Sequence, residues 1–540
     1  MRRALTLLAT VALTVVSLSI PAAADEVPKE FGTDWDDPRT AAKPVERPDT
    51  ESCKVTLVDH EFDDGEPVAG EYRPPEDCGE SWSKVVLRLD GSGSGQQSER
   101  MGRLTIGGIP VFKTSTPRPS AEGVHWRQDK DLTGYAALLA SKQRTSMRLD
   151  DSGDGVLDIR ISLTFYATDE QHPPADGADK VLGLTDRQTE GRDLTGKLHT
   201  PRNTEKLLAD VYATGAGGCE DRWYLAAPAG TGYSCRADSG PYREVQVLID
   251  GELAGLAAPF PNLYAAGWSN PYLWSTLPAP RTFDIRPLTY DLTPYLGLLN
   301  DGRSHEVTVR VAGLDPEAEG WSTPTAFRAW RDAGSRVVDG GLLDAQTRTL
   351  SNDVSGSGDS KGGKTKVAAE HSHTATGWLS TSHGEVVTSV ERTVGNTATH
   401  RWGAGERTES LSATWRDDQT RTVSGSDSDV SEHVVEREFT LDGHSSTGED
   451  DRLTSRMDLS DTKRVVDTDS SGGDAKYTVT DRYAGNASYR PDVPPGEARA
   501  VADSQQRYRI SGDLPCYDHA ITTKNGYVTR EVDRCGKAVR

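Results

Sequence analysis

Strict alternation of apolar and polar residues restricts this chain to very few folds. In VLDIRISLTFYA, residues 156–167, every second side chain from Leu157 to Phe165 is apolar and falls on one face of an extended strand. A period of two is typical of a half-buried β-strand. Similar runs occur in VVLRLD, REVQVLIDG and HEVTVRVAG, whereas stretches with a helical period are few and short. Several such strands separated by turn residues predict an all-β protein.

The chain has 540 residues, a length that corresponds to roughly three or four domains. We expect two jelly-roll or β-sandwich units in tandem, followed by a C-terminal β-rich region. Strands in GEVVTSVERTV and AKYTVTDRY favour folded structure over disorder in that polar last region. The expected segments are a signal peptide at 1–24, a flexible leader at 25–50, a first unit at 51–190, a second unit at 191–340, a Gly/Ser-rich linker or loop at 341–365, and the C-terminal region at 366–540.

The N-terminal stretch MRRALTLLATVALTVVSLSIPAAADE has the pattern of a Sec-type signal peptide. Two arginines precede an apolar run, and Ala22–Ala24 precede an acid, which predicts cleavage after Ala24. The apolar run is shorter than the ~20 residues of a membrane-spanning helix. We therefore expect a secreted, extracellular protein with no membrane association after cleavage. The formal net charge of -22 argues against nucleic acid as a partner, because phosphate backbones attract basic surfaces.

Six cysteines fit an oxidising compartment. They fall in three local pairs, which suggests the disulfides Cys53–Cys78, Cys219–Cys235 and Cys516–Cys535. The last pair flanks KNGY, and Asn-Gly is a strong two-residue hairpin indicator. In that hairpin Cys516 and Cys535 fall opposite each other, within the reach of a disulfide.

The best-known hydrolase motifs, GxSxG, HExxH and the P-loop, do not occur in this sequence. His371 and His373 could chelate a metal, but no acid or cysteine accompanies them at a typical spacing, so we interpret them as solvated. DDSGDGVLD, residues 150–158, has part of a calcium-loop pattern but lacks the final bidentate Glu, so we interpret it as a polar turn. We expect no metal and no cofactor.

Carboxylates remain as candidate catalytic groups. Glu99 and Arg100 stand at the start of a strand, after a Gly-rich loop. Glu220 and Asp221 follow a cysteine directly. Three further candidates could contact a substrate: His125, Trp126 and Trp223. On composition alone, a structural role is the better interpretation at each of these positions.

Taken together, several stretches resemble the peptide-N4-(N-acetyl-β-glucosaminyl)asparagine amidase A family. They are VVLRLDGSGSGQQSERMGRLTIGGIPVFKTSTPRP, GVHWRQDKDLTGYAALLA, GGCEDRWYLAAP and the long run that begins YREVQVLIDGELAG. The terminal CYDHAITTKNGYV is a weaker match. The stretches run in the family's order and cover most of residues 80–315.

The resemblance implies hydrolysis of the amide between an Asn side chain and the first GlcNAc of an N-glycan, with N-glycosylated peptides or glycoproteins as partners. The family is similar in chemistry to a bacterial glycoamidase built of two jelly rolls. In that enzyme the acid of a Trp-Asp-Arg triplet and a Glu two residues after a Cys carry the active site. Those positions correspond here to Glu99 and Asp221. The family usually has Tyr-Asp-Arg where this chain has Ser-Glu-Arg, and Glu where it has Asp221.

From these matches we expect Glu99 to act as the general base that positions a water molecule, and Arg100 to orient it. Asp221 would hold the substrate and share a proton, and Glu220 would replace it if the register slips by one. Trp126 and Trp223 would stack on sugar faces or pack in the core. Two alternatives stay open: a non-catalytic glycan-binding secreted β protein on the same scaffold, and a glycoside hydrolase.

Overall fold

The structure is a computed structural model that describes residues 29–79, 81–95, 97–150, 155–190, 192–263, 270–315, 317–318, 320–425, 429–470 and 472–535. The expected signal peptide lies outside these residues, as does part of the polar turn at 150–158. Antiparallel sheets dominate, so the all-β prediction is confirmed. Among the described residues both α-helices have four residues, and no helix combines the length and apolar character needed to cross a membrane.

The first unit consists of two four-stranded sheets that enclose one core. The alternating strand supplies part of this core, because its side chains Leu157, Ile159 and Ile161 are fully buried against the facing sheet. One sheet has the order β1 (Ser52–Phe62), β8 (Leu157–Ala167), β3 (Trp82–Gly93), β6 (Val124–Asp131), and the other has β2 (Val68–Tyr72), β7 (Gln143–Leu149), β4 (Met101–Ile106), β5 (Ile109–Ser115). The short helices η1 (Glu76–Cys78), η2 (Thr133–Tyr135) and α1 (Ala136–Leu139) lie in the connections.

The second unit also has two sheets, and it begins near Lys180 rather than at residue 191. The reason is that β9 and β10 pair with its strands. One sheet has the order β10 (Thr185–Glu190), β11 (Asp193–Leu198), β17 (His305–Ala312), β14 (Glu244–Ile249), β15 (Glu252–Ala257). The other has β16 (Leu288–Asp291), β12 (Thr204–Val211), β19 (Thr325–Arg331), β9 (Lys180–Leu182), and β13 (Thr214–Gly215) pairs with β18 (Trp321–Ser322). The helices are η3 (Gly218–Leu225), η4 (Pro271–Leu273), η5 (Thr293–Tyr295) and α2 (Leu296–Leu299). The tandem jelly-roll winding stays a prediction.

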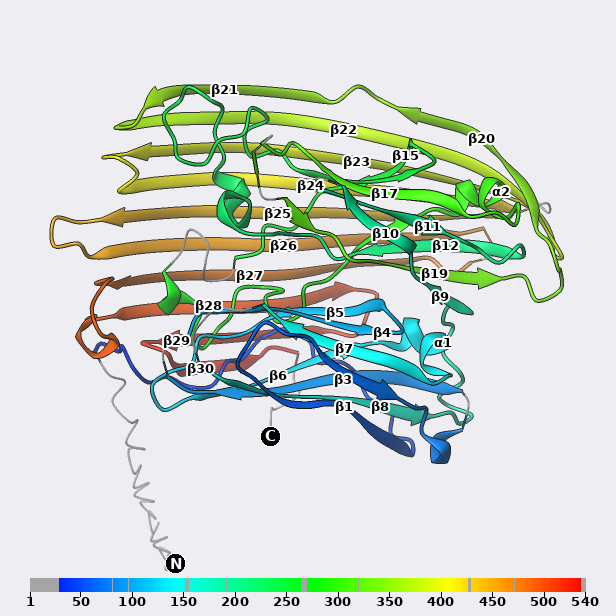
Figure 1. Cartoon of the computed structure of the whole chain (residues 1–540), viewed down its shortest axis with the longest axis horizontal. Helices are drawn as coiled ribbons and strands as arrows, with labels where there is room; N and C mark the ends of the chain where they lie inside the picture. Colours follow the sequence, from blue (N-terminus) through cyan, green and yellow to red (C-terminus); the bar gives the residue numbers. More distant parts are fainter. Residues whose placement is uncertain are drawn as a thin grey trace, which may run out of the picture.

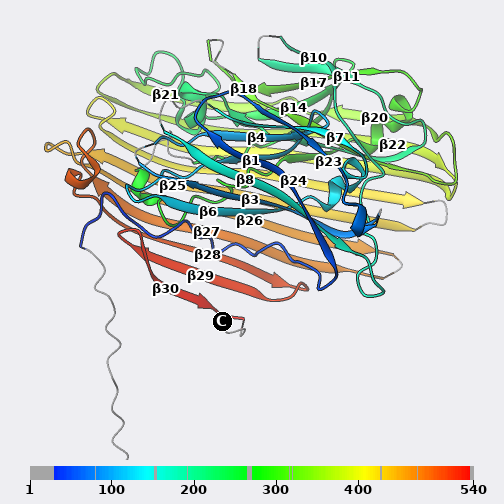
Figure 2. The same cartoon turned by 60° about the horizontal axis from the view of Figure 1, so that its bottom comes forward.

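The C-terminal region forms one antiparallel sheet of eleven long strands, in front of which both units are drawn in Figures 1 and 2. Apolar residues of the second unit and of this sheet make one continuous core. The strands are β20 (Asp339–Thr347), β21 (Ser351–Asp359), β22 (Gly362–Thr381), β23 (Gly384–Gly403), β24 (Thr408–Gly425), β25 (Val430–Thr447), β26 (Leu453–Asp469), β27 (Ala475–Tyr489), β28 (Val501–Gly512), β29 (Tyr517–Lys524) and β30 (Tyr527–Asp533), with η6 (Pro495–Glu497) before β28.

Two expectations about connecting segments were wrong. Residues 341–365 lie mostly in strands, because β20 and β21 pair with the two halves of β22 and satisfy their backbone groups there. Residues 29–50 are held against the fold rather than forming a flexible leader. Phe31 forms a bridge with Ala500, and the fully buried Ala41 donates its N–H to Gln506 Oε1 at 2.8 Å.

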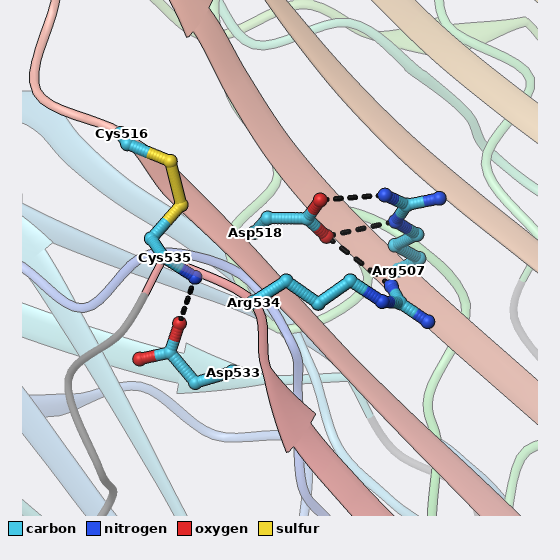
Figure 3. The surroundings of a disulfide bond; sticks show 6 residues. All are labelled: Arg507, Cys516, Asp518, Asp533, Arg534 and Cys535. Carbon is cyan, nitrogen blue, oxygen red and sulfur yellow. Dashed lines mark hydrogen bonds and ion pairs between the residues drawn. A yellow bond between two sulfur atoms is a disulfide. The ribbon is translucent and has the colours of Figure 1, made fainter.

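The three expected disulfides are all present. Around Cys516–Cys535, the hairpin turns at Asn525-Gly526 as expected, and a bulge between Thr522 and Thr523 shifts the register by one residue. The Cα atoms of the two cysteines are 5.8 Å apart. Figure 3 shows a group of ion pairs beside the disulfide, in which Asp518 accepts hydrogen bonds from Arg507 and Arg534.

His371 and His373 are buried, which corrects their interpretation as solvated side chains. His371 Nδ1 lies 2.8 Å from Glu244 Oε2, and the two ring nitrogens of His373 contact Tyr295 and Thr347 at 2.8 Å each. Both rings therefore join the second unit to the large sheet through hydrogen bonds.

Candidate active site

A cavity of about 620 Å³ lies where the leader, the first unit, the second unit and the large sheet meet. Its walls come from residues 32–35, the segments before β4 and after β5, residues 271–283, and the connection between β27 and β28. Glu99 is the carboxylate that the first unit contributes to this wall. The cavity therefore contains one of the two expected catalytic acids.

Glu99 owes its position to the start of β4. The next residue, Arg100, is anchored by two hydrogen bonds to Thr116 at the end of β5, both 3.0 Å long. Successive side chains of extended backbone point in opposite directions. Arg100 is 2 % exposed and points into the protein, which leaves Glu99 on the side of the cavity.

Burial raises the pKa of Glu99 to about 7, because a carboxylate loses hydration there. Arg118 opposes this shift, since its Nε lies 3.6 Å from Glu99 Oε1 and favours the ionised form. Arg118 stands between Pro117 and Pro119, whose rings fix the backbone φ angle on both sides. The carboxyl group can thus gain or lose a proton near neutral pH.

Among the described residues, Arg118 is the cation that forms an ion pair with Glu99. The guanidinium of Arg100 donates to the backbone carbonyls of Phe62 and Gly155 at 3.2 and 2.5 Å. The ion pair observed for Glu99 is therefore with Arg118 on the segment after β5, and the orienting role expected of Arg100 stays a prediction.

Aromatic rings from three segments line the same cavity: Trp35, Tyr272, Trp274 and Tyr489. Edge-to-face contacts connect three of them, with centroids 6.3 Å apart for Trp35 and Tyr272 and 5.1 Å apart for Tyr272 and Tyr489. All four are half-buried, so part of each ring faces the cavity. Rings with an apolar face and a polar edge are suited to sugar surfaces.

Glu220 and Asp221 lie in η3, away from the residues that line this cavity. Glu220 is 2 % exposed and makes a bidentate ion pair with Arg243 at 2.7 and 2.9 Å, and Trp321 Nε1 donates to it at 2.7 Å. Asp221 Oδ1 accepts a hydrogen bond from Gly217 N at 3.1 Å. The structure does not bring Asp221 to the cavity of Glu99.

The other expected substrate contacts also lie elsewhere. Trp126 and Trp223 are each 3 % exposed and pack in the cores of the first and second units. His125 is exposed, and its backbone N–H donates to Asp37 at 2.9 Å. None of the three lines the cavity. The two indole rings have no open face for a sugar, so their packing role is the one that the structure supports.

Sequence reasoning missed the aromatic wall and Arg118. Tyr272 and Trp274 belong to NPYLW, which lies within the long family-like run, and Arg118 belongs to TSTPRP. The cluster of aromatic residues around Pro271 is the sequence feature that could have identified the loop. Trp35 and Tyr489 had no such indication, because they reach the cavity only through tertiary packing.

One group of described residues could hold a metal ion. It consists of Glu205, Asp332 and His383, whose ligand atoms lie within 4.8 Å of one another. The carboxylate of Asp332 already accepts hydrogen bonds from Ser382 and Gly334. This group is not part of the cavity lining.

Comparison with solved structures gives weak similarities. PNGF-II matches with a TM-score of 0.34 and 13% identity over 56% of this chain and 65% of its own. Recombinant peptide:N-glycanase F matches with a TM-score of 0.34 and 12% identity over 52% of this chain and 96% of its own. Scores this low carry no argument about fold or function.

Comparison at the level of sequence is stronger. Peptide-N4-(N-acetyl-beta-glucosaminyl)asparagine amidase A of Prunus dulcis is 28% identical over 383 residues, and this match spans 64% of the chain and 66% of the Prunus protein, just under two thirds. A family model described as peptide N-acetyl-beta-D-glucosaminyl asparaginase amidase A matches residues 40–330, more than half of the 540 residues. The chain therefore belongs to the peptide N-acetyl-beta-D-glucosaminyl asparaginase amidase A family.

Proposed function

We propose that this protein hydrolyses the amide bond between an Asn side chain and the first GlcNAc of an N-glycan on glycopeptides or glycoproteins. The products are Asp in the peptide and a glycosylamine. One observation carries the proposal: the carboxyl group of Glu99, whose pKa burial raises to about 7, lines an aromatic-walled cavity in a chain of this family. The three disulfides favour a secreted protein.

In the proposed mechanism Glu99 is the general base. Ionised Glu99 takes a proton from water while the water oxygen attacks the carbonyl carbon of the Asn side chain. The carbon–nitrogen bond then breaks, and the proton passes to the departing nitrogen. A base is most effective when its pKa lies near the working pH, and Arg118, whose Nε lies 3.6 Å from Glu99 Oε1, favours the ionised form of the carboxyl group.

The aromatic wall supplies the sugar-binding part of the proposal. Trp35, Tyr272 and Tyr489 offer ring faces at the same cavity as Glu99. Stacking of GlcNAc on these rings would place the linking amide next to the carboxylate. Such positioning of a reacting bond is a large part of enzymatic rate enhancement.

The two-carboxylate form of the proposal adds Asp221 as the group that holds substrate and shares a proton. Its support is the sequence position, two residues after Cys219. The hydrogen bond from Gly217 favours instead a role in fixing the start of η3. The Asp221→Asn variant separates the two roles, because loss of activity in a protein of unchanged stability would support the catalytic one.

The main test is the conversion of a dansylated N-glycopeptide, followed by mass spectrometry of the peptide. We expect the wild type to give the mass change of Asn to Asp together with an intact released glycan. Glu99→Gln should lose that activity, and Glu122→Gln, an exposed acid nearby in sequence, should keep it. Full activity of Glu99→Gln would overturn the assignment of the base.

A second candidate function is glycan binding without hydrolysis. Two features favour it: Glu99 and Asp221 are the less usual acids at their positions in the family, and Asp221 lies outside the cavity lining. Binding of the glycopeptide by the wild type with no change in peptide mass would establish this candidate. Glycosidase activity would show itself differently, since a sugar would stay on the Asn.

A further inference from the structure

A second cavity, of about 600 Å³, lies on the inner face of the large sheet, separate from the one that contains Glu99. Its floor is formed by β24, β25 and β26, and its wall by β12 and β16 of the second unit. Its lining is mostly charged, with five Lys or Arg side chains among it: Lys206, Arg392, Arg421, Arg437 and Lys463.

Three acids of this cavity already have side-chain partners. Arg392 binds Asp417 through two hydrogen bonds of 2.6 and 2.7 Å. Arg421 Nε lies 2.7 Å from Asp291 Oδ2, and His433 contacts Asp467. The remaining acids of the lining, Glu432 and Asp469, are exposed.

Arg437 and Lys463 have no such partner. They stand directly opposite each other on β25 and β26, so their side chains leave the same face of the sheet. No described residue forms an ion pair with either one or accepts a hydrogen bond from it, although Asp417, which Arg392 already binds, stands opposite Arg437 on β24, and Lys463 Nζ lies 6.0 Å from the Tyr477 ring centroid. Lys206 of β12 lines the same cavity and forms no ion pair with a described residue, and its Nζ lies 4.6 Å from the centroid of the Trp330 ring.

This arrangement is unfavourable without an anion. Like charges directly opposite each other across strands repel, and both side chains are half-buried, where a charge is less well hydrated than at the surface. Burial, followed by the repulsion of Arg281, lowers the pKa of Arg437 to about 10. Burial, followed by the repulsion of Arg437, lowers the pKa of Lys463 to about 8. An anion that entered the cavity would give both cations an ion-pair partner.

We propose that the cavity between β12, β16 and β24–β26 binds a phosphate group through Arg437, Lys463 and Lys206. A guanidinium donates to two oxygens of a tetrahedral oxyanion at once, and ammonium groups add charge from other directions. Up to three cations match the charge of a phosphate dianion better than that of a single carboxylate. This site is independent of the cavity that contains Glu99.

The test is calorimetric titration of the full-length protein with inorganic phosphate in a phosphate-free buffer, against sodium chloride at equal ionic strength. Arg437→Gln and Lys463→Gln should each weaken phosphate binding by on the order of tenfold, the value of one charge-assisted hydrogen bond. Arg464→Gln is the matched control. It removes a cation from the same strand, next to Lys463 but on the opposite face, where Arg464 pairs with Glu436 at 3.6 Å.

Glycerol 3-phosphate, compared with glycerol, distinguishes a free phosphate from a phosphate ester. Binding of the ester at least as tight as that of inorganic phosphate would identify esters as the ligand source, and binding of inorganic phosphate alone would identify the free ion. Absence of binding to the wild type beyond the chloride control would overturn the proposal. An affinity of Lys463→Gln for phosphate equal to that of the wild type would also overturn the proposal. This second variant decides the question if Arg437→Gln does not fold.

Discussion

At the scale of single residues, Glu220, which is buried, and Glu99, which is half-buried, have surroundings that suit them to different roles. Glu220 is enclosed by Arg243 and Trp321, so its carboxylate is fully satisfied and serves structure. Glu99 has one arginine at 3.6 Å and a cavity on its other side. Burial without full compensation is the condition that raises an acid's pKa toward neutrality.

The first prediction concerns the pH dependence of hydrolysis. As a base, Glu99 must be ionised, so kcat/KM should rise with pH through a midpoint near its pKa of about 7. Arg118→Gln removes the cation that favours ionisation, so the midpoint should move to higher pH. Rates of glycopeptide cleavage across the pH range measure both effects. An unchanged midpoint in Arg118→Gln would show that another group controls the profile.

The second prediction concerns stability. The pKa of Glu99 is raised from 4.5 to about 7 in the folded protein, so its contribution to stability is present below pH 4.5 and is lost as pH rises toward 7. Glu99→Gln stays neutral and avoids this loss. Urea denaturation above pH 7 should find the variant more stable by up to about 3 kcal/mol, and the difference should vanish below pH 4.5.

The third prediction concerns the ion pair of Glu220. Glu220→Gln leaves Arg243, which is 1 % exposed at its side chain, without an anionic partner. Breaking a buried pair on one side costs about 3–5 kcal/mol, which chemical denaturation will measure. Asp221→Asn is the adjacent comparison and should cost much less. Equal losses in the two variants would mean that η3, rather than the ion pair, determines the result.

At the scale of elements, alternation predicted the strands well and composition predicted the connections poorly. The strand at 157–167 was recognisable from its residues alone, because its period matches its burial. The Gly/Ser-rich residues around 351–359 resemble a linker by composition. They form β21 because β22 offers a complete row of backbone partners, and no local pattern in the segment encodes that partner.

The fourth prediction uses a glycine in the contact between α2 and β20. A Cβ atom on Gly297 would lie 2.1 Å from the backbone nitrogen of Gly341, so Gly297→Ala must push the helix away from the strand. We expect a loss of about 1–3 kcal/mol, measured as a lower denaturation midpoint. Gly425→Ala is the control, since a Cβ there meets no atom within 4 Å. A similar loss in both variants would point to a general effect of alanine.

At the scale of the whole molecule, the candidate site belongs to no single unit. Sequence motifs could identify Glu99, because its neighbours in the chain carry the family pattern. They could not identify Trp35, Tyr272 and Tyr489 as one wall, since that depends on how the leader, the second unit and the large sheet pack together. The choice between stacking and core packing for Trp126 and Trp223 could not be made from the sequence for the same reason, because burial is decided by partners distant in sequence.

The fifth prediction tests this shared construction. Trp35→Ala removes the leader's ring from the cavity, so KM for a glycopeptide should rise several-fold while kcat changes little, as expected when uniform substrate binding is lost. Trp330→Ala, an indole outside this cavity, should leave KM unchanged. If Trp35→Ala lowers kcat and leaves KM unchanged, the leader positions Glu99 rather than binding the sugar.

The attachment of the leader to the C-terminal strands affects how fast the protein folds. Asp36 accepts a hydrogen bond from the backbone N–H of Val528, 492 positions away, and Phe31 is tied to Ala500. Contacts that span such separations form slowly, because the intervening chain must first be ordered. During refolding, sheet structure should therefore return before catalysis does, and the delay between circular dichroism and activity measures how late the cavity closes.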